Sequence, residues 1–358
     1  MIKADGTQLE DVPFVSVIVP IRNEARYIRG CLESIVRQDY PHERMEVLSA
    51  DGMSTDGTRE AVQSFAELDI PMHWVDNPGR IVPTGMNLAL RQARGDILVR
   101  VDGHCEIAPD YISNCVRHLQ SSDVDGVGGS METVGETPLS ETIAVAMSSP
   151  FGVGGSAFRT VRAVTMYADT VPFPAYSRDI VERAGLYDEE LVRNQDDEYN
   201  YRIRELGGKI LLASDVKSRY YSRGSLKKLW KQYFQYGYWK VRVLQKHLRQ
   251  MSLRQFVPLV FVLVLVLSGL LAVFTSWGAW LLTFIAGSYL IANLAASIYT
   301  ASQRGWKHLV LMPVCFTILH ISYGIGFLIG LVKFMYRWRD KKEIVPLQPS
   351  PSKVDRIL

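Results

Sequence analysis

Short apolar runs of strand length alternate with helix-like segments along the first hundred residues of the chain. The strand-like runs cover residues 14–19, 45–50, 71–75 and 97–101, and the first and last are rich in β-branched residues. Between them apolar residues recur every three or four positions, as at Ile28, Leu32 and Ile35, which predicts helices. The alternation predicts an α/β domain built on a parallel, doubly wound sheet.

The pattern continues more weakly over the next hundred residues. It predicts helices at 109–120 and from Asn194 onward, and strands at 124–131, 171–176 and 209–213.

A segment of another kind follows, because Ser225 to Arg249 mixes Lys and Arg with Trp, Tyr and Phe. This composition is typical of an amphipathic helix on an anionic membrane surface. Aromatic and basic residues could also bind nucleic acid. The next residues decide against that alternative. Apolar runs at Phe256–Phe274, Trp277–Tyr299 and His308–Val332 are each long enough to span a bilayer. We therefore expect a lipid bilayer, and no nucleic acid, as a partner.

The charges around these runs conflict with three full spans. Basic residues precede Phe256, and Arg304 and Lys307 follow the second run, so both ends of this pair are expected inside. A third span would place the basic residues from Lys333 to Lys342 outside, against the usual bias. One run is therefore expected to be re-entrant or interfacial. The last run is the best candidate, since it contains Pro313 and several glycines.

These features divide the chain into a catalytic domain at residues 1–215, an interface segment at 216–254, a transmembrane region at 255–333 and a basic, disordered tail at 334–358. Residues 1–11 are polar and lack the apolar stretch of a signal peptide. The four cysteines form no CxxC pair, which fits reduced thiols. We expect a multi-pass membrane protein with its N-terminal domain on the cytoplasmic side. The sequence leaves a homo-oligomer open.

Acidic residues follow two of the predicted strands, and a third begins a predicted helix. Asp51 follows the second strand, Asp102 follows the fourth, and Asp196 stands at the start of a later helix. Side chains alternate along a strand, so Asp102 and His104 are expected on one side, where they could bind Mn²⁺ or Mg²⁺. Each acid could instead cap a helix or end a turn. Together they suit group transfer from a nucleoside diphosphate: one acid binds the nucleoside, another helps to hold a cation at the diphosphate, and the third is a base.

The chain from about Pro13 to Lys240 resembles the inverting family 2 glycosyltransferases of GT-A fold. The motifs that carry the resemblance are Val15–Glu24, Asp51–Thr58 and Asp102–His104. The membrane-anchored form, with its Gly237–Trp239 run, is similar to the succinoglycan-biosynthesis type of glucosyltransferase.

The resemblance implies a role for each candidate residue. The nucleotide-sugar pocket would contain Pro20, Asn23, Glu24, Asp51, Asp102 and Arg223. Asp102 and His104 would hold the metal, Asp196 would be the catalytic base, and Gln232 and Trp239 would contact the acceptor. The chain departs from the family at Gln235-Tyr236, where processive members carry Arg-Trp, and at Tyr220-Tyr221, where the family often has a metal-binding His.

The resemblance implies an enzyme that moves a hexose, glucose in the first instance, from a UDP-sugar to a polyprenyl-linked saccharide in exopolysaccharide assembly. It also implies a multi-pass protein of a bacterial inner membrane, with its catalytic domain in the cytoplasm. Two alternatives stay open. In the first, the acceptor is the polyprenyl phosphate itself, which is already ionised and needs no base. In the second, the chain is a non-catalytic membrane scaffold that does not bind a UDP-sugar.

Overall fold

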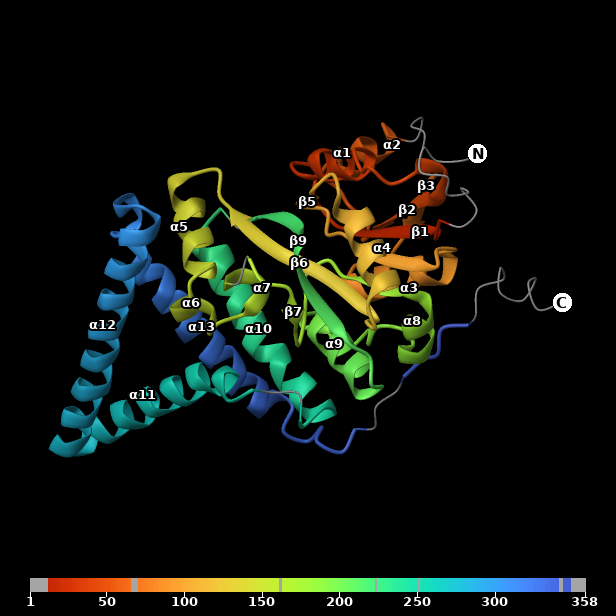
Figure 1. Cartoon of the computed structure of the whole chain (residues 1–358). Coiled ribbons are helices and arrows are strands. Elements are labelled where there is room, and N and C mark those ends of the chain that lie inside the picture. Colours follow the sequence, from red (N-terminus) through yellow and green to blue (C-terminus); the bar gives the residue numbers. More distant parts are fainter. Residues whose placement is uncertain are drawn as a thin grey trace. The chain divides into compact units, whose positions relative to one another are not determined.

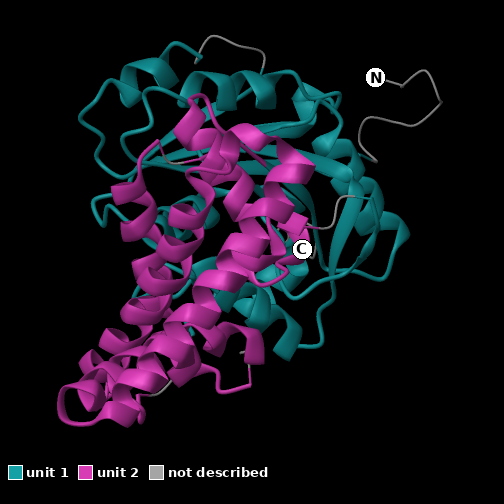
Figure 2. Ribbon diagram, turned by 90° about the vertical axis from the view of Figure 1, so that its left-hand side faces the viewer, with its two compact units in different colours: residues 1–132, 161–220, 343–358 teal, residues 133–160, 221–342 magenta. Residues whose placement is uncertain are grey.

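The computed structural model describes residues 12–65, 70–160, 163–222, 224–249, 252–340 and 344–348. The chain forms two compact units (Figure 2). The first unit contains residues 1–132, 161–220 and 343–358, and the second contains residues 133–160 and 221–342. The domain boundaries expected from the sequence stay a prediction.

The first unit is built on a mixed sheet with helices packed against it (Figure 1). Its strands are β1 (Val15–Ile21), β2 (Met45–Asp51), β3 (Met72–Asp76), β4 (Ile97–Arg100), β5 (Cys105–Ile107), β6 (Gly126–Val134), β7 (Met166–Tyr167), β8 (Ala175–Ser177) and β9 (Ile210–Tyr221). Its helices are α1 (Ile28–Val36), η2 (His42–Arg44), α2 (Thr58–Gln63), α3 (Val82–Gln92), α4 (Tyr111–Ser121), α8 (Arg178–Ala184) and α9 (Gln195–Glu205).

The predicted α/β class and the parallel, doubly wound part of the sheet are confirmed. Among the described strands the order is β3-β2-β1-β4-β8-β6-β9-β5, with β7 paired to β9. The first four strands in this order are parallel. Every residue of β1 and β2 is buried, as expected for parallel strands covered on both faces. The sheet is not parallel throughout, because β8 is antiparallel to β4 and to β6.

Several predicted boundaries were wrong. Pro20 does not end its strand but lies inside β1, where it pairs with Ala50. Its missing N–H is tolerated because the pairing of β1 with β4 ends at Ile18. The strand expected at residues 209–213 is the longer β9. Residues 150–153, for which no helix was predicted, form the short helix α6 (Pro150–Val153).

The second unit is helical. Its elements are α5 (Pro138–Met147), α6, α7 (Ala157–Thr160), α10 (Leu226–Lys246), η3 (Leu253–Phe256), α11 (Val257–Phe274), α12 (Ser276–Arg304), η4 (Trp306–His308) and α13 (Met312–Lys333). The predicted interface helix is present as α10. Three helical segments, Leu253–Phe274, Ser276–Arg304 and Met312–Lys333, are long and apolar enough to cross a membrane. Sequence periodicity did not predict α5, although Thr137 and Pro138 are an N-cap and a first-turn proline.

Glycines allow the backbones of α10 and α13 to lie against each other. A Cβ added to Gly326 of α13 would be 2.1 Å from the Phe234 carbonyl oxygen of α10. A Cβ added to Gly237 of α10 would be 2.0 Å from the Tyr323 carbonyl oxygen. Both distances are far inside van der Waals contact, so only glycine fits at either position.

We expect Gly326→Ala to destabilise the second unit by about 1–3 kcal/mol, because the added methyl group must push the two helices apart. The matched control is Gly287→Ala in α12, where an added Cβ has nothing within 4 Å. That change should be neutral or slightly stabilising, since alanine favours helix over glycine. Thermal unfolding of the full chain in detergent measures both, and equal melting temperatures for the two variants would contradict the packing argument.

Candidate functional site

The carboxyl ends of three parallel strands meet at one edge of the sheet in the first unit. Ile21 at the end of β1 pairs with Asp51 at the end of β2. On the other side of β1, Arg100 at the end of β4 pairs with Ile18. Parallel sheets bind ligands at this edge, because the loops that follow the strands gather there.

Hydrogen bonds join the loop after β1 to the loop after β2. The Asn23 backbone has a positive φ of 56°, which asparagine tolerates better than most residues. Its N–H donates to Ser54 Oγ at 2.9 Å, and its Oδ1 accepts from the Thr55 N–H at 2.9 Å. The buried Asp51 carboxylate in turn accepts from the Ser54 N–H at 3.1 and 3.2 Å. Asn23 and Asp51 are thus joined through their hydrogen bonds to Ser54.

Glu24 links the same loop to the metal-motif candidate. Its N–H donates to Thr58 Oγ1 at 2.8 Å. Its Oε1 lies 3.1 Å from His104 Nδ1. The approach of these two atoms lacks hydrogen-bond geometry, and the buried Nδ1 has no hydrogen-bond partner among the described residues. The ring of His104 also meets Tyr220 edge-on, with ring centres 5.0 Å apart.

Asp102 follows β4, and its carboxylate is held by Arg100. Arg100 Nε donates to Asp102 Oδ1 at 2.8 Å, and Nη2 donates to Oδ2 at 3.2 Å. Both side chains are largely buried, with 7% of Arg100 and 22% of Asp102 exposed. Burial alone would raise the pKa of Asp102, but the positive charge of Arg100, aided by His104, holds it below its usual value. Asp102 is therefore ionised at neutral pH.

The Asp102–His104 segment is a turn between β4 and β5, and not the end of a strand. We expected the alternation of side chains along a strand to point Asp102 and His104 to one side. That reason was wrong, because the period of two holds in a strand and not in a turn.

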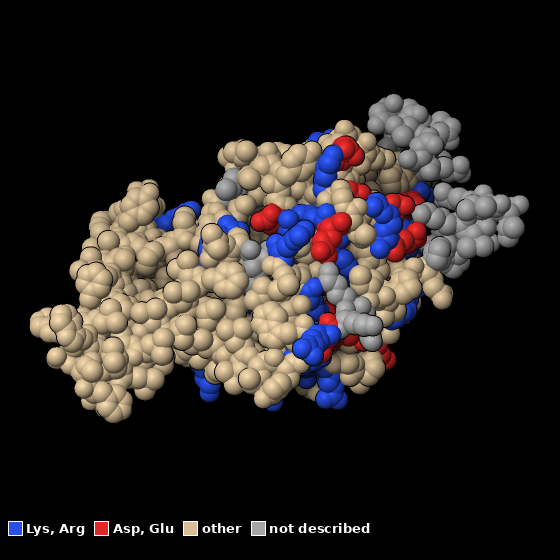
Figure 3. All heavy atoms as spheres, turned by 90° about the horizontal axis from the view of Figure 1, so that it is seen from below, with Lys and Arg blue, Asp and Glu red and all other residues tan. Residues whose placement is uncertain are grey.

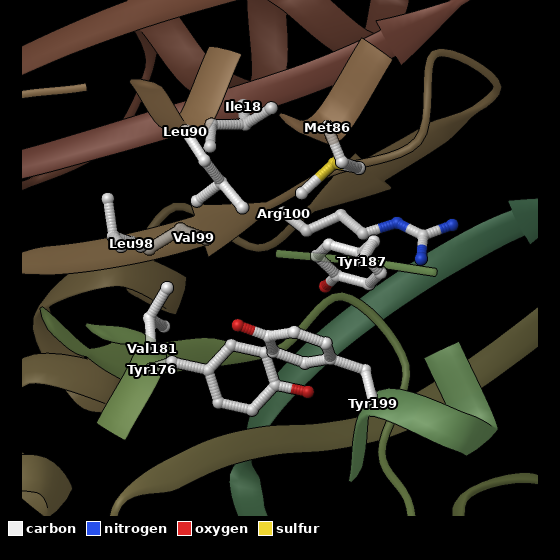
Figure 4. A pocket seen from close by; sticks show the side chains of 10 residues that line it. All are labelled: Ile18, Met86, Leu90, Leu98, Val99, Arg100, Tyr176, Val181, Tyr187 and Tyr199. Atoms are coloured by element: carbon white, nitrogen blue, oxygen red, sulfur yellow. The ribbon is translucent and has the colours of Figure 1, made fainter. Parts of the chain in front are cut away.

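Arg100 also connects Asp102 with Asp196. Burial disfavours the charge of Arg100, but Asp102 and then Asp196 raise its pKa above the usual value. Its Nη1 is buried and has no hydrogen-bond partner among the described residues. Figure 4 shows the guanidinium group extending past the Tyr187 ring, away from Leu98 and Val181, which line the same cavity.

Asp196 lies in the first turn of α9, and the rest of that helix is firmly anchored. Glu198 and Arg202 form a buried ion pair at 2.7 Å, with 4% of each side chain exposed. Arg202 Nη1 also donates to the carbonyl oxygens of Ala184 and Leu186, both at 2.7 Å. Glu198 is therefore engaged in structure, while the partial positive charge of the helix N-terminus stabilises an anion at Asp196.

Comparisons with known proteins give the family and the fold of this chain. The model of the family described as "Glycosyl transferase family 2" matches residues 16–183. The chain is 31% identical over 323 residues to the succinoglycan biosynthesis protein ExoA of Rhizobium meliloti (strain 1021), which covers 90% of this chain and 96% of that protein. The chain belongs to glycosyl transferase family 2. The predicted family and its GT-A-like fold are confirmed.

Two further proteins are similar to this family 2 glycosyltransferase. A Methanococcus voltae protein is 28% identical and covers 89% of this chain and 98% of its own length. It is named dolichyl N-acetyl-α-D-glucosaminyl phosphate 3-β-D-2,3-diacetamido-2,3-dideoxy-β-D-glucuronosyltransferase. A solved structure, the mannosyltransferase PcManGT of Pyrobaculum calidifontis with GDP-Man and Mn²⁺, has a TM-score of 0.57 and 22% identity. The match covers 88% of this chain and 87% of that chain, and it supports the fold.

The glycosyltransferase offers few donors to a divalent cation by itself. Among the described residues there is no cluster of three or more His, Cys, Asp and Glu side chains that could hold a metal. Asp102 supplies carboxylate oxygens and His104 an imidazole with one buried nitrogen free of hydrogen bonds. Both Asp102 oxygens also accept from Arg100, so this pair could hold a cation only if most of its other ligands came from outside the protein.

The roles of three predicted residues stay predictions. Arg223 lies outside the described residues. Gln232 and Trp239 are on α10 in the second unit. Gln232 Nε2 donates to the Tyr236 hydroxyl at 2.9 Å, and the Trp239 ring packs against Phe334 with centres 5.8 Å apart. The structure gives these two side chains packing partners, and their contact with an acceptor stays a prediction.

Sequence reasoning missed Arg100 and Tyr187. Tyr187 is held by Asn87, whose Oδ1 accepts from the Tyr187 N–H at 2.8 Å. Burial raises the pKa of Tyr187 to about 12, with Arg100 opposing and Asp196 adding to the rise. The sequence did contain a signal for Arg100, because a cation inside an apolar strand run requires a charged partner. No local pattern identified Tyr187.

Proposed function

We propose that this glycosyltransferase moves a hexose, glucose in the first instance, from a UDP-sugar to a lipid-linked saccharide. The transfer would take place at the cytoplasmic face of a bacterial inner membrane during exopolysaccharide assembly. The similarity to a succinoglycan biosynthesis protein supports the pathway class. The similarity to a transferase named for a dolichyl-linked saccharide supports the acceptor class.

One observation carries the chemical part of the proposal. Arg100 is in a bidentate ion pair with Asp102, and the negative charge of Asp196 also raises the pKa of Arg100. The carboxylate proposed as the base and the motif proposed to bind the diphosphate therefore both influence one cation, which supports their use in one direct displacement.

The proposed reaction is a single displacement. The acceptor hydroxyl attacks the anomeric carbon as its proton passes to Asp196, and the bond from that carbon to the diphosphate oxygen breaks. Attack from the face opposite the leaving group inverts the anomeric configuration. A divalent cation held by Asp102 and His104 would neutralise the charge of the leaving diphosphate. Arg223 is proposed to support the same diphosphate.

The remaining residues are proposed to bind the two substrates. Asp51 would accept hydrogen bonds from the base or ribose of the nucleotide, and Pro20, Asn23 and Glu24 would line that pocket. Gln232 and Trp239 would contact the lipid-linked acceptor.

The proposal is tested with the purified full chain and separate donors: UDP-glucose, UDP-N-acetylglucosamine, UDP-glucuronic acid and GDP-mannose. Acceptors are a polyprenyl-diphosphate saccharide and polyprenyl phosphate. Mass spectrometry identifies the product, and NMR of the new linkage reports its anomeric configuration. Transfer of glucose from UDP-glucose to the saccharide with inversion supports the proposal. Retention of configuration, or absence of both binding and transfer with every donor, would overturn it.

The metal-binding role predicts that His104→Ala weakens Mn²⁺ binding in the presence of UDP by about tenfold or more, because one of two protein ligands is lost. The control is His42→Ala in η2, which should leave Mn²⁺ binding unchanged. Calorimetric titration of Mn²⁺ measures the affinity without relying on turnover. Transfer should also stop in excess chelator and return with Mn²⁺ at least as well as with Mg²⁺. Equal Mn²⁺ affinity in both variants would remove His104 from the metal site.

A further inference from the structure

The three membrane-span candidates of the second unit differ in how much of their surface the protein covers. The most apolar window of Leu253–Phe274 is 17% buried and that of Ser276–Arg304 is 11% buried, whereas that of Met312–Lys333 is 44% buried. The first two thus leave most of their apolar side chains for lipid. Helix α13 has instead a large surface already packed against protein.

The main partner of α13 is α10, and the two helices run in the same direction. Gly326 faces Phe234, and Gly330, one turn later, faces Tyr238, where an added Cβ would be 2.7 Å from the carbonyl oxygen. The contact further along α10 is thus made with the residue further along α13, as in parallel helices. Since only glycine fits at Gly326 and Gly237, the helices are joined backbone to backbone over this stretch.

Polar contacts fix the ends of the same two helices at one level. Arg242 of α10 is fully buried, and its Nη2 lies 3.0 Å from Asp340 Oδ2, just beyond α13. Gln245 Nε2 donates to the Phe334 carbonyl oxygen at 2.8 Å, which satisfies a group at the end of α13. Wherever α10 lies relative to the membrane, the C-terminal part of α13 therefore lies with it.

Helix α10 is unsuited to cross a bilayer. It carries six basic residues in its 21-residue sequence, including Lys227, Lys228 and Lys231, which are exposed. Charged side chains in a membrane-spanning helix are strongly unfavourable unless they face a polar interior. Basic residues beside aromatic ones suit the surface of an anionic membrane instead.

The chain after α13 returns to the first unit. The Leu186 N–H donates to the Val345 carbonyl oxygen at 2.8 Å, and both residues belong to that unit. The first unit therefore holds chain from before α10 and chain from after α13. One folded unit lies on one side of a membrane, so the chain between them must cross an even number of times.

Helices α11 and α12 form the pair that suits crossing. They pack against each other, and residues 255–303 contain no charged side chain. The turn that joins them is followed by Trp277 and Trp280, which are 81% and 72% exposed and suit a membrane interface. In the face shown in Figure 3, the outer part of the lobe formed by these helices shows no Lys, Arg, Asp or Glu.

We propose that only α11 and α12 cross the membrane, as a hairpin, while α13 is held beside α10 on the side of the catalytic unit. This topology also removes the charge conflict, because the basic residues after α13 then lie on the same side as those before α11. The proposal depends on the packing of the second unit and on the Leu186–Val345 hydrogen bond in the first, and it is independent of donor, acceptor and metal.

Single cysteines introduced into the full chain test the proposal. Ser276→Cys marks the α11–α12 turn, Gln303→Cys the end of α12, and Tyr336→Cys the segment after α13, where Tyr336 is 87% exposed. Asp179→Cys, on an exposed position of α8, marks the side of the catalytic unit. The four native cysteines are buried, so the unchanged chain is the background control. The probe is a membrane-impermeant maleimide, applied to intact cells and to inverted vesicles.

We expect Gln303→Cys and Tyr336→Cys to be labelled in the same preparation as Asp179→Cys, and Ser276→Cys to be labelled in the other. If Tyr336→Cys is labelled opposite to Asp179→Cys, α13 crosses and the proposal is overturned. If Ser276→Cys is labelled together with Asp179→Cys, the hairpin enters and leaves on one side, which also overturns it.

Discussion

Replacing Asp196 by asparagine is expected to lower kcat by about 10²–10⁴-fold, the usual span for loss of a general base. A sugar hydroxyl is a poor nucleophile at neutral pH, so the displacement needs a group that accepts its proton. Asparagine keeps the size of the side chain but cannot accept a proton. The start of α9 should survive the change, because Asn200 Nδ2 donates at 2.9 Å to the backbone carbonyl of residue 196 and not to its side chain. Donor binding should be unchanged.

The matched control is Asp197→Asn, one position further along α9, which should cost much less because neighbouring helical side chains diverge by about 100°. Steady-state kinetics give kcat, and calorimetry with UDP gives donor binding for both variants. A larger loss for Asp197→Asn would show that the base has been assigned to the wrong acid. If neither change matters, the acceptor is an already ionised lipid phosphate, and the base assignment fails.

Replacing Arg100 by leucine is expected to lower the free energy of unfolding by about 3–5 kcal/mol, the usual cost of leaving one member of a buried ion pair alone. For a unit of this size the melting temperature should fall by roughly 10 °C. The Asp102 carboxylate would lose both donors while it stays mostly buried. The control is Arg37→Leu, because Arg37 pairs with Glu33 at 3.9 Å and 67% of its side chain is exposed. An exposed pair of this kind contributes about 0–1 kcal/mol.

The effect of Arg100→Leu should depend on pH in a definite direction. The folded-state pKa of Asp102 is lowered, chiefly by Arg100 acting against burial. Its contribution to stability is therefore present above its unfolded-state pKa of about 3.9 and is lost as the pH falls through the lower, folded-state pKa. The difference between wild type and variant should be full at pH 7 and should shrink below about pH 4. A difference that is the same at pH 7 and pH 3 would show that the loss comes from packing and not from the ion pair.

Local sequence determined the frame of the catalytic unit. Residues such as Val17 and Val47 lie in runs that are apolar throughout, and a strand buried on both faces produces that pattern. Alternation of these runs with helices predicted the parallel strands, and parallel strands bring Ile21, Asp51 and Arg100 to one edge. The strand β8 was only partly predicted, because its three residues leave little periodic signal and its antiparallel pairing depends on distant partners.

Sequence also determined which residues had acid, metal-binding or membrane chemistry, but not how they combine. Asp102 and Asp196 were candidates as single acids at element ends, yet their connection runs through Arg100, which is 96 positions from Asp196 in the chain. Periodicity reports on neighbours within a few residues, whereas the influence of one charge on another across the fold depends on where whole elements lie. The tertiary structure therefore decided that Arg100 belongs to the site.

The same division holds for the membrane region. Composition determined that three helices are apolar and long enough to span a bilayer. It could not distinguish a helix that faces lipid from one that packs against protein, because both are apolar. That distinction depends on the partners of each helix: for α13, the close contact of Gly326 with α10 and the return of Val345 to the first unit. Length and hydropathy are properties of a segment, but burial is a property of its neighbours, and only the folded chain supplies them.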